Sequence, residues 1–152
     1  ELIAELRHLR RYMVRHPSGH LQRAMALFIA AGHYHRTIRR RRVSLAHRWS
    51  LVHEALDRHL DWSVPAPPGG GSVWVPGPLH LDGPALVRRA LDRGVVIERG
   101  DTYFRQPAGR DHYLRLGFAA IPVAAIDPGV AILADVVADQ MKHHGPTETG
   151  TR

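Results

Sequence analysis

The sequence predicts a mixed fold of helices and strands (α/β, in the sense of α+β), in which a helical arm precedes a small β-α-β-β-α domain. Apolar residues recur every three or four positions through residues 2–60, which is typical of amphipathic helices. The prolines and glycines of residues 64–71 (VPAPPGGG) do not allow a helix, so this segment marks the one clear boundary between the arm and the small domain. Shorter segments with period-two alternation follow, typical of helices packed on a small sheet.

Three helices are predicted in the arm. The first should end before Pro17, because the residue preceding a proline disfavours helix. Ser18 is placed to cap the second helix, and Gly32 to end or bend it. A long third helix is expected over residues 34–60. The first helix rests on the apolar positions Leu2, Leu6, Leu9 and Met13.

One helix is predicted early in the small domain. Asp82 should cap it, Pro84 fits its first turn, and Gly94 should end it. A last helix should start at Asp127 and Pro128. The expected inward residues are Val87, Ala90 and Leu91 in the first of these helices, and Ile126, Val130, Leu133 and Val137 in the last.

Three short strands are predicted around these helices, over residues 72–75, 95–97 and 113–119. A loop, residues 99–111, should separate the last two of them. The glycines of residues 69–71 lack the strand-before and helix-after setting of a phosphate-binding loop, so a flexible hinge explains them better.

Arg115 is the unusual residue of the last strand. Leu114, Leu116 and Phe118 alternate to one side, and Arg115 points to the other with Gly117. A guanidinium between apolar neighbours costs desolvation unless an anion meets it. Either an internal carboxylate or a ligand carboxylate could do so, since the guanidinium fork grips two oxygens at once. Residue chemistry alone favours the internal pair.

The amino-acid composition limits the kinds of site and chemistry that the chain can contain. The 152 residues contain no cysteine, which excludes disulfides and zinc sites of the Cys type. No apolar run is long enough to cross a bilayer, so no membrane partner is expected. The net charge of +7 rests on arginine, and Lys142 is the only lysine. A Schiff-base lysine would therefore have to be Lys142, in a polar segment poorly suited to hold a cofactor.

Other conspicuous residues have ordinary explanations. The basic run at residues 39–42 is interpreted as a solvated helix face, because base readout needs a grooved motif that is missing. The histidines lack metal-ligand spacing, so no metal site is expected. Trp49 and Trp74 are interpreted as core residues. A basic helical adaptor that binds nucleic acid or acidic proteins is kept as a third functional hypothesis.

Five segments in this order resemble the C-terminal part of fold-type I pyridoxal-phosphate (PLP) aminotransferases, and most closely the GntR/MocR-type transcription regulators. The resemblance covers almost the whole chain. The matching segments are HLQRAMALFIAAGHYHRTIRRRR (20–42), GGGSVWV (69–75), LDRGVVIERGDTYF (91–104), YLRLGFAAIP (113–122) and IDPGVAILADVV (126–137).

The resemblance implies a domain organisation. Residues 1–62 would form the helical arm that leads out of a large PLP domain, residues 63–143 the small C-terminal domain, and residues 144–152 a disordered tail. The large domain, with the PLP lysine, would precede Glu1, so the chain is expected to be a piece of a longer protein. PLP is expected in that full-length protein and not covalently bound to this piece.

The resemblance also implies a role for single residues. Arg115 stands where the superfamily has the arginine that binds the substrate's carboxylate, and we expect a buried guanidinium without an internal partner. Tyr103 and Phe104, in the loop before this strand, are expected either to line the same pocket or to have an ordinary packing role. No catalytic residue is assigned within the chain. Arg99 departs from the commoner Ile-Glu-Pro-Gly reading of the family, so the shape of its loop is left open.

The function expected from the resemblance is effector sensing by a cytoplasmic, homodimeric transcriptional regulator. An amino-acid or amine effector would engage Arg115, the small domain would close, and a separate N-terminal domain would bind DNA. The alternative is a free-standing class I/II PLP-dependent aminotransferase, in which the same residues position a substrate.

Overall fold

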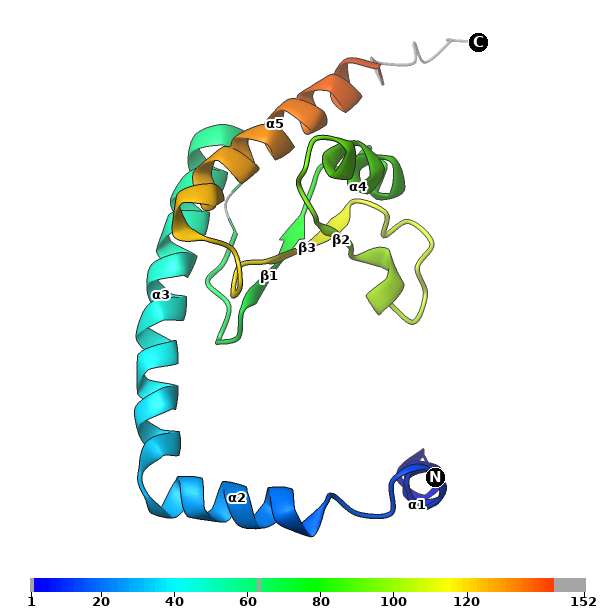
Figure 1. Cartoon of the computed structure of the whole chain (residues 1–152). Coiled ribbons are helices and arrows are strands. Elements are labelled where there is room, and N and C mark those ends of the chain that lie inside the picture. Colours follow the sequence, from blue (N-terminus) through cyan, green and yellow to red (C-terminus); the bar gives the residue numbers. More distant parts are fainter. Residues whose placement is uncertain (1, 63, 144–152) are drawn as a thin grey trace. The chain divides into compact units, whose positions relative to one another are not determined.

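The computed structural model describes residues 2–62 and 64–143 (Figure 1). The chain divides into two compact units, Glu1–Val43 and Ser44–Arg152, and the long helix α3 (His33–Leu60) contributes to both. The proposed boundary near residue 62 stays a prediction. The tail predicted at residues 144–152 lies outside the described residues.

The first unit contains the helices α1 (Leu2–Met13) and α2 (Gly19–Ala30) and the start of α3, as the apolar spacing predicts. Gly32 separates α2 from α3 with a φ of 74°, a left-handed conformation that glycine adopts without strain. Ser18 stands at the N-cap position of α2, but its side chain makes no capping hydrogen bond.

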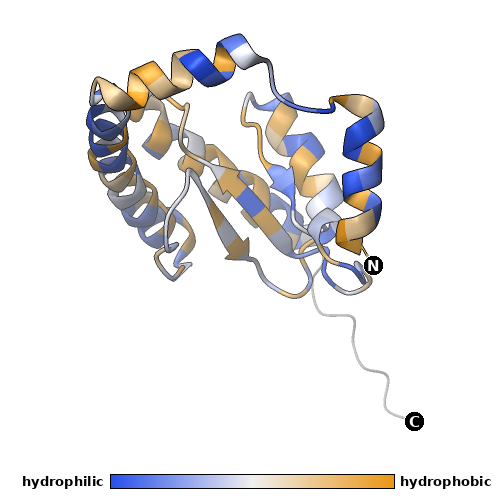
Figure 2. Cartoon of the chain, turned by 90° about the horizontal axis from the view of Figure 1, so that it is seen from below, coloured by the Kyte–Doolittle hydropathy of each residue, from blue (hydrophilic) through white to orange (hydrophobic). Residues whose placement is uncertain are grey.

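Neither α1 nor α2 buries any residue. Figure 2 shows hydrophobic residues interspersed with hydrophilic ones along the helix nearest the N-terminus, so the helix is amphipathic. Leu2 is 71% exposed and Leu21 69%. Within the described residues the apolar stripes of these two helices therefore have no apolar cover.

The second unit is built on a three-stranded antiparallel sheet of order β1-β3-β2. The strands are β1 (Ser72–Pro76), β2 (Glu98–Arg99) and β3 (Tyr113–Gly117). Arg115 in the central strand pairs with Trp74 on one side and with Glu98 on the other. The register thus sets three side chains in a row across the sheet.

One face of the sheet forms the hydrophobic core. Leu114, Leu116 and the following Phe118 are buried there, as the alternation around Arg115 predicts. Three helices contribute to the same core: α4 (Gly83–Asp92), α5 (Ile126–His143) and the second half of α3. The core residues of these helices are Val52, Ala55, Leu56, Leu86, Ala90, Ile126, Val130, Leu133, Val136 and Val137.

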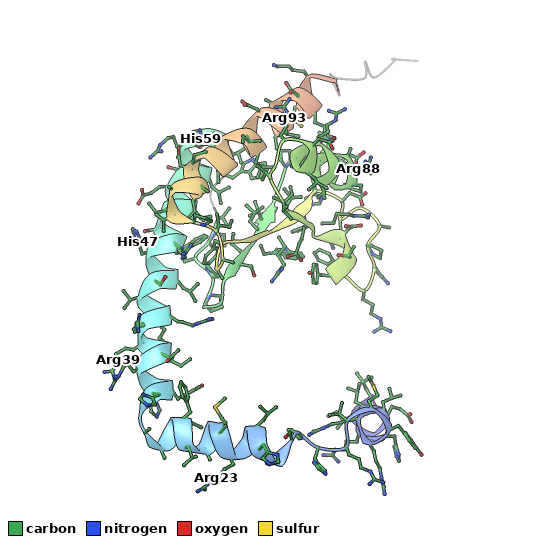
Figure 3. All side chains as sticks on the ribbon, viewed as in Figure 1. Arg23, Arg39, His47, His59, Arg88 and Arg93 are labelled. Carbon is green, nitrogen blue, oxygen red and sulfur yellow. The ribbon has the colours of Figure 1, made fainter. Side chains whose placement is uncertain are left out.

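Ion pairs at the surface join these helices. Arg58 and His59 of α3 both contact Asp127 of α5, at 2.7 and 3.1 Å. Arg93, directly after α4, contacts Asp139 of α5 at 2.8 Å, and Figure 3 shows His59 and Arg93 at these positions. These groups are partly solvated, so the apolar core contributes more to stability than the ion pairs do.

The sequence predicts the ends of α4 correctly but only part of its inner face. The Asp82 side chain accepts a hydrogen bond from the Ala85 amide at 2.9 Å, and Gly94 follows the helix with a φ of 81°. Ala90 is buried, but Leu91 is 57% exposed and Leu86 takes its place in the core. Both sets have helical spacing, and packing against the sheet selects the face centred on residues 86 and 90.

The predicted strand over residues 95–97 is wrong. Val96 is 77% exposed and only Ile97 is buried in the core, while strand pairing begins one residue later, at Glu98. Continuous apolar residues resemble a buried strand, but here the chain is still leaving α4 after Gly94. The consequence for the site is that Glu98 lies beside Arg115.

The inner face of α4 gives a stability prediction. Leu86→Ala should lower the free energy of unfolding by about 2–5 kcal/mol, because it leaves a cavity in a filled core. Leu91→Ala removes the same atoms from an exposed position and should cost less than about 0.5 kcal/mol. Urea denaturation of both variants measures the difference, and equal losses would contradict the observed orientation of α4.

Gly83, the first residue of α4, gives a second stability prediction. A Cβ at this position would lie 2.1 Å from the backbone oxygen of Asp111. Gly83→Ala should therefore destabilise the protein by about 1–3 kcal/mol through overpacking. A Cβ at Gly129 in α5 would meet no atom within 4 Å, so Gly129→Ala should be neutral or stabilise by up to about 1 kcal/mol. Thermal unfolding should show a lowered midpoint for Gly83→Ala and an unchanged or raised midpoint for Gly129→Ala.

Candidate carboxylate-binding site

The outer face of the sheet carries polar and aromatic side chains. Trp74, Tyr113 and Arg115 alternate with the buried residues of β1 and β3 and are all partly exposed. Because the helices cover the inner face, these side chains project from the side of the sheet opposite the hydrophobic core. This outer face is the candidate site.

Arg115 forms an ion pair with Glu98. Its Nη1 donates to Oε1 of the carboxylate, and the two side chains are 36% and 46% exposed. The expectation of a buried guanidinium without an internal partner is therefore wrong. The structure instead shows the internal pair that residue chemistry alone favours, because antiparallel pairing of β2 with β3 places Glu98 directly opposite Arg115.

Tyr103 extends this pair into a chain of three side chains. Its hydroxyl donates to the second carboxylate oxygen of Glu98 at 2.6 Å, and its ring lies 5.9 Å from the Arg115 guanidinium carbon. The hydrogen bond to Glu98 raises the pKa of the Tyr103 hydroxyl above its ordinary value. Both carboxylate oxygens of Glu98 are thus held, one by a neutral donor and one by a cation.

An aromatic cluster adjoins the chain. Trp74 lies 5.7 Å from Tyr103 and 5.6 Å from Phe104 between ring centroids, and Phe104 lies 5.0 Å from Tyr113. The Arg110 guanidinium carbon lies 5.3 Å from the centre of the Phe104 ring. The assignment of Trp74 to the core is wrong, because this side chain lies on the outer face. Aromatic walls of this kind supply apolar contact area beside a charge.

The loop that carries Tyr103 is fixed by a second ion pair. Arg99 donates to both carboxylate oxygens of Asp101, at 3.0 and 2.5 Å. Asp101 is buried, and these hydrogen bonds lower the pKa of its carboxyl below the ordinary value. The Gly100 amide, between the two, donates to the Tyr113 carbonyl at 2.7 Å. Arg99 thus stabilises the loop at the position where it departs from the family pattern.

Several known proteins are similar to this chain in sequence or in fold, although no family model matches it. The HTH-type transcriptional regulator TauR of Rhodobacter capsulatus is 35% identical over 133 residues, which are 87% of this chain and 28% of TauR. The chain therefore spans about a quarter of the length of such relatives. An uncharacterised HTH-type regulator of Bacillus subtilis, YdfD, is 28% identical over 72% of the chain.

Solved aminotransferase structures contain the same fold. The multiple substrate aminotransferase of Thermococcus profundus superposes with a TM-score of 0.69 at 25% identity, over 76% of this chain and 29% of that one. LysN, the α-aminoadipate aminotransferase of Thermus thermophilus, superposes with a TM-score of 0.65 at 28% identity, over 76% of this chain and 30% of LysN. The chain is an aminotransferase-like domain, and its sequence is similar to a part of HTH-type transcriptional regulators. The fold expected from the sequence is thereby confirmed.

The structure of this aminotransferase-like domain brings the predicted site residues close together. Arg115 and Tyr103 share Glu98 as a partner, and Phe104 lies in the adjoining aromatic cluster. Sequence reasoning missed Glu98 and the position of Trp74. A strand assigned to residues 98–99, in place of 95–97, would have placed Glu98 opposite Arg115.

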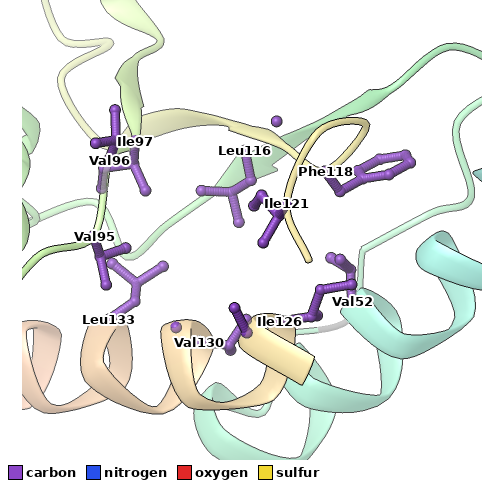
Figure 4. Close-up of a pocket in the computed structure, with 13 residues that line it drawn as sticks. Val52, Val95, Val96, Ile97, Leu116, Phe118, Ile121, Ile126, Val130 and Leu133 are labelled. Carbon is purple, nitrogen blue, oxygen red and sulfur yellow. The ribbon is translucent and has the colours of Figure 1, made fainter. Parts of the chain in front are cut away.

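An apolar pocket of the domain lies on the other side of the sheet (Figure 4). Leu116, Phe118, Ile126 and Val130 are among the residues that line it. Its lining is apolar throughout, so it offers no charge to a carboxylate. It belongs to the hydrophobic core and is separate from the site at Arg115.

The other features that the sequence analysis considered contribute little to this site. Residues 39–42 are exposed on α3, and Figure 3 shows Arg39 projecting from that helix. The Arg48 guanidinium donates to the Ile121 carbonyl, so it is engaged within the second unit. Within the described residues, no three His, Cys, Asp or Glu side chains are grouped to hold a metal ion, and no helix could span a membrane.

The Arg99–Asp101 pair predicts a pH dependence of stability. A lowered folded-state pKa stabilises the fold above the ordinary Asp value of about 3.9, and this contribution is lost as pH falls through the folded pKa. Asp101→Asn should therefore be less stable than the wild type at pH 7, and the difference should shrink below about pH 4.

Urea denaturation at several pH values measures this difference. Asp135→Asn, on the exposed face of α5, is the matched control and should show little change at any pH. A destabilisation by Asp101→Asn that is equally large at acidic pH would show that charge pairing is not the cause.

Proposed function

We propose that this domain senses an amino-acid effector for a PLP-binding transcriptional regulator, and that Arg115 binds the effector's carboxylate. The observation that carries the proposal is a partly exposed guanidinium on the outer face of the sheet, beside an aromatic wall. The fold that carries Arg115 is similar to that of solved aminotransferases, and related proteins are named as HTH-type regulators.

The fit of the cofactor to this chain is limited. LysN was solved with N-(5'-phosphopyridoxyl)-L-leucine, which combines the cofactor with an amino acid. Bound PLP supplies an aldehyde that combines with amino groups. Lys142 of this chain is 75% exposed near the end of α5, with Asp139 4.0 Å away, so it does not fit covalent attachment of PLP. The attachment lysine is therefore assigned to another part of the full-length protein.

Arg115 would contribute orientation. A guanidinium that donates two N–H groups to one carboxylate fixes the direction of the bound molecule as well as its position. Apolar atoms of the effector would then contact the aromatic cluster around Trp74. Held in this way, the effector's amino group is presented in one orientation, which lowers the entropic cost of any later step.

Regulation would follow from a difference in affinity. An effector shifts an equilibrium between an open and a closed small domain only if it binds the closed form more tightly. Contacts to Arg115 that form on closure would supply that difference. The proposal also includes DNA binding through an HTH domain, which the names of the relatives support. A homodimer and a cytoplasmic location are further parts of the proposal.

The second candidate is a free-standing aminotransferase that uses the same residues to position a substrate. It is supported by the solved aminotransferases and by an aromatic-amino-acid aminotransferase of Thermococcus litoralis, 32% identical over 60% of this chain. Specific DNA binding by the full-length protein would favour the regulator, and steady transamination without DNA binding would favour the enzyme.

Substitution of Arg115 in the full-length protein tests the site. Arg115→Gln should weaken binding of amino-acid effectors by about 10–100-fold, because hydrogen bonds to charged groups contribute roughly 1.5–3 kcal/mol. PLP loading, followed by visible absorption that borohydride removes, should be unchanged. Isothermal titration of the standard amino acids gives the affinities.

The matched control is Arg88→Gln, which removes the same charge from the exposed side of α4. This variant should bind effectors like the wild type. If amino-acid binding survives Arg115→Gln unchanged, Arg115 is a structural residue and the proposed site is wrong.

A further inference from the structure

Glu98 occupies the guanidinium that the effector would use. Its Oε1 accepts from Nη1 of Arg115, which is one of the two terminal nitrogens needed for an end-on bidentate contact. A ligand carboxylate can therefore take this geometry only if Glu98 moves away. A side-on contact through Nε would leave Glu98 in place but would set two carboxylates side by side.

The pair is weak enough to be exchanged. Arg115 is 36% and Glu98 46% exposed, and ion pairs in such partly solvated positions contribute little to stability. β2 contains only two residues and lies at the edge of the sheet, so the Glu98 side chain is not confined by further strands. An incoming carboxylate would replace one anion by another at the same cation.

Tyr103 keeps the displaced carboxylate nearby. Its hydroxyl holds the second oxygen of Glu98 at 2.6 Å, and this contact does not depend on Arg115. After exchange, Glu98 would remain as a negative charge at the rim of the site. That charge would repel a second carboxylate on the ligand and would tolerate an uncharged or cationic side chain.

We propose that Glu98 is a specificity-determining residue, which competes with the ligand for Arg115 and excludes ligands that carry a second negative charge. The proposal rests on the proposed function of Arg115. It names the effector class as amino acids with one carboxylate and an uncharged or cationic side chain. Aspartate and glutamate are the disfavoured class.

Glu98→Gln tests the proposal in the full-length protein loaded with PLP. The variant keeps the shape of the side chain and removes its charge. Isothermal titration should show tighter binding of aspartate and glutamate by about tenfold, as expected for removal of a like charge at a distance of several ångströms. The affinity for neutral amino acids should rise less, because for them the substitution removes only the competition of Glu98 for Arg115.

Two controls separate charge at this site from other effects. Glu54→Gln removes the same charge from the exposed surface of α3 and should leave all affinities unchanged. In the Arg115→Gln background, the Glu98→Gln substitution should no longer improve binding of neutral amino acids. Without the Arg115 guanidinium, Glu98 and the ligand carboxylate no longer compete for the same cation. A purely structural role of Glu98 would not produce this dependence.

The outcomes distinguish the two proposals. If Arg115→Gln abolishes binding but Glu98→Gln leaves the preference against aspartate and glutamate unchanged, the inference about Glu98 is wrong and the function of Arg115 stands. The same conclusion follows if the wild type binds aspartate and glutamate as tightly as asparagine and glutamine. If no standard amino acid binds, or if Arg115→Gln has no effect, the proposed function fails and the inference fails with it.

Discussion

Hydrogen bonding of the central strand β3 to both of its neighbours determines the rest of the second unit. Because side chains alternate along this strand, one sheet face supplies Leu114 and Leu116 to the core and the other presents Arg115. A shift in register by one residue would bury the guanidinium and expose both leucines. The register of β3 therefore determines both the hydrophobic core on one face of the sheet and the candidate site on the other.

Sequence reasoning reached most of this arrangement where local chemistry is decisive. Apolar spacing identified the arm helices and α5, Asp82 and Gly94 marked α4, and alternation gave the correct side for Arg115. It failed where the local sequence fits two structures equally well and only contacts between distant residues determine which one forms. The apolar residues before Glu98 resemble a strand, and only pairing with β3 shows that the strand starts later. The partner of Arg115 was missed for the same reason, since no local pattern joins residues 98 and 115.

The loop between β2 and β3 shows how a departure from a family pattern is accommodated. Arg99 stands where the family resemblance led us to expect proline, and it donates to the buried carboxylate of Asp101, two residues further on. A side-chain ion pair, instead of the fixed φ of a proline ring, therefore restrains this loop. Tyr103, at the end of the same short segment, keeps a position from which it reaches Glu98.

The uncovered apolar stripes of α1 and α2 affect how the protein behaves in solution. Contiguous exposed apolar surface promotes self-association unless another surface covers it. A sample that contains only these helices and the small domain would be prone to form oligomers through the arm, at a rate that rises with concentration. The arm, rather than the folded sheet domain, is then the segment that limits solubility during expression and purification.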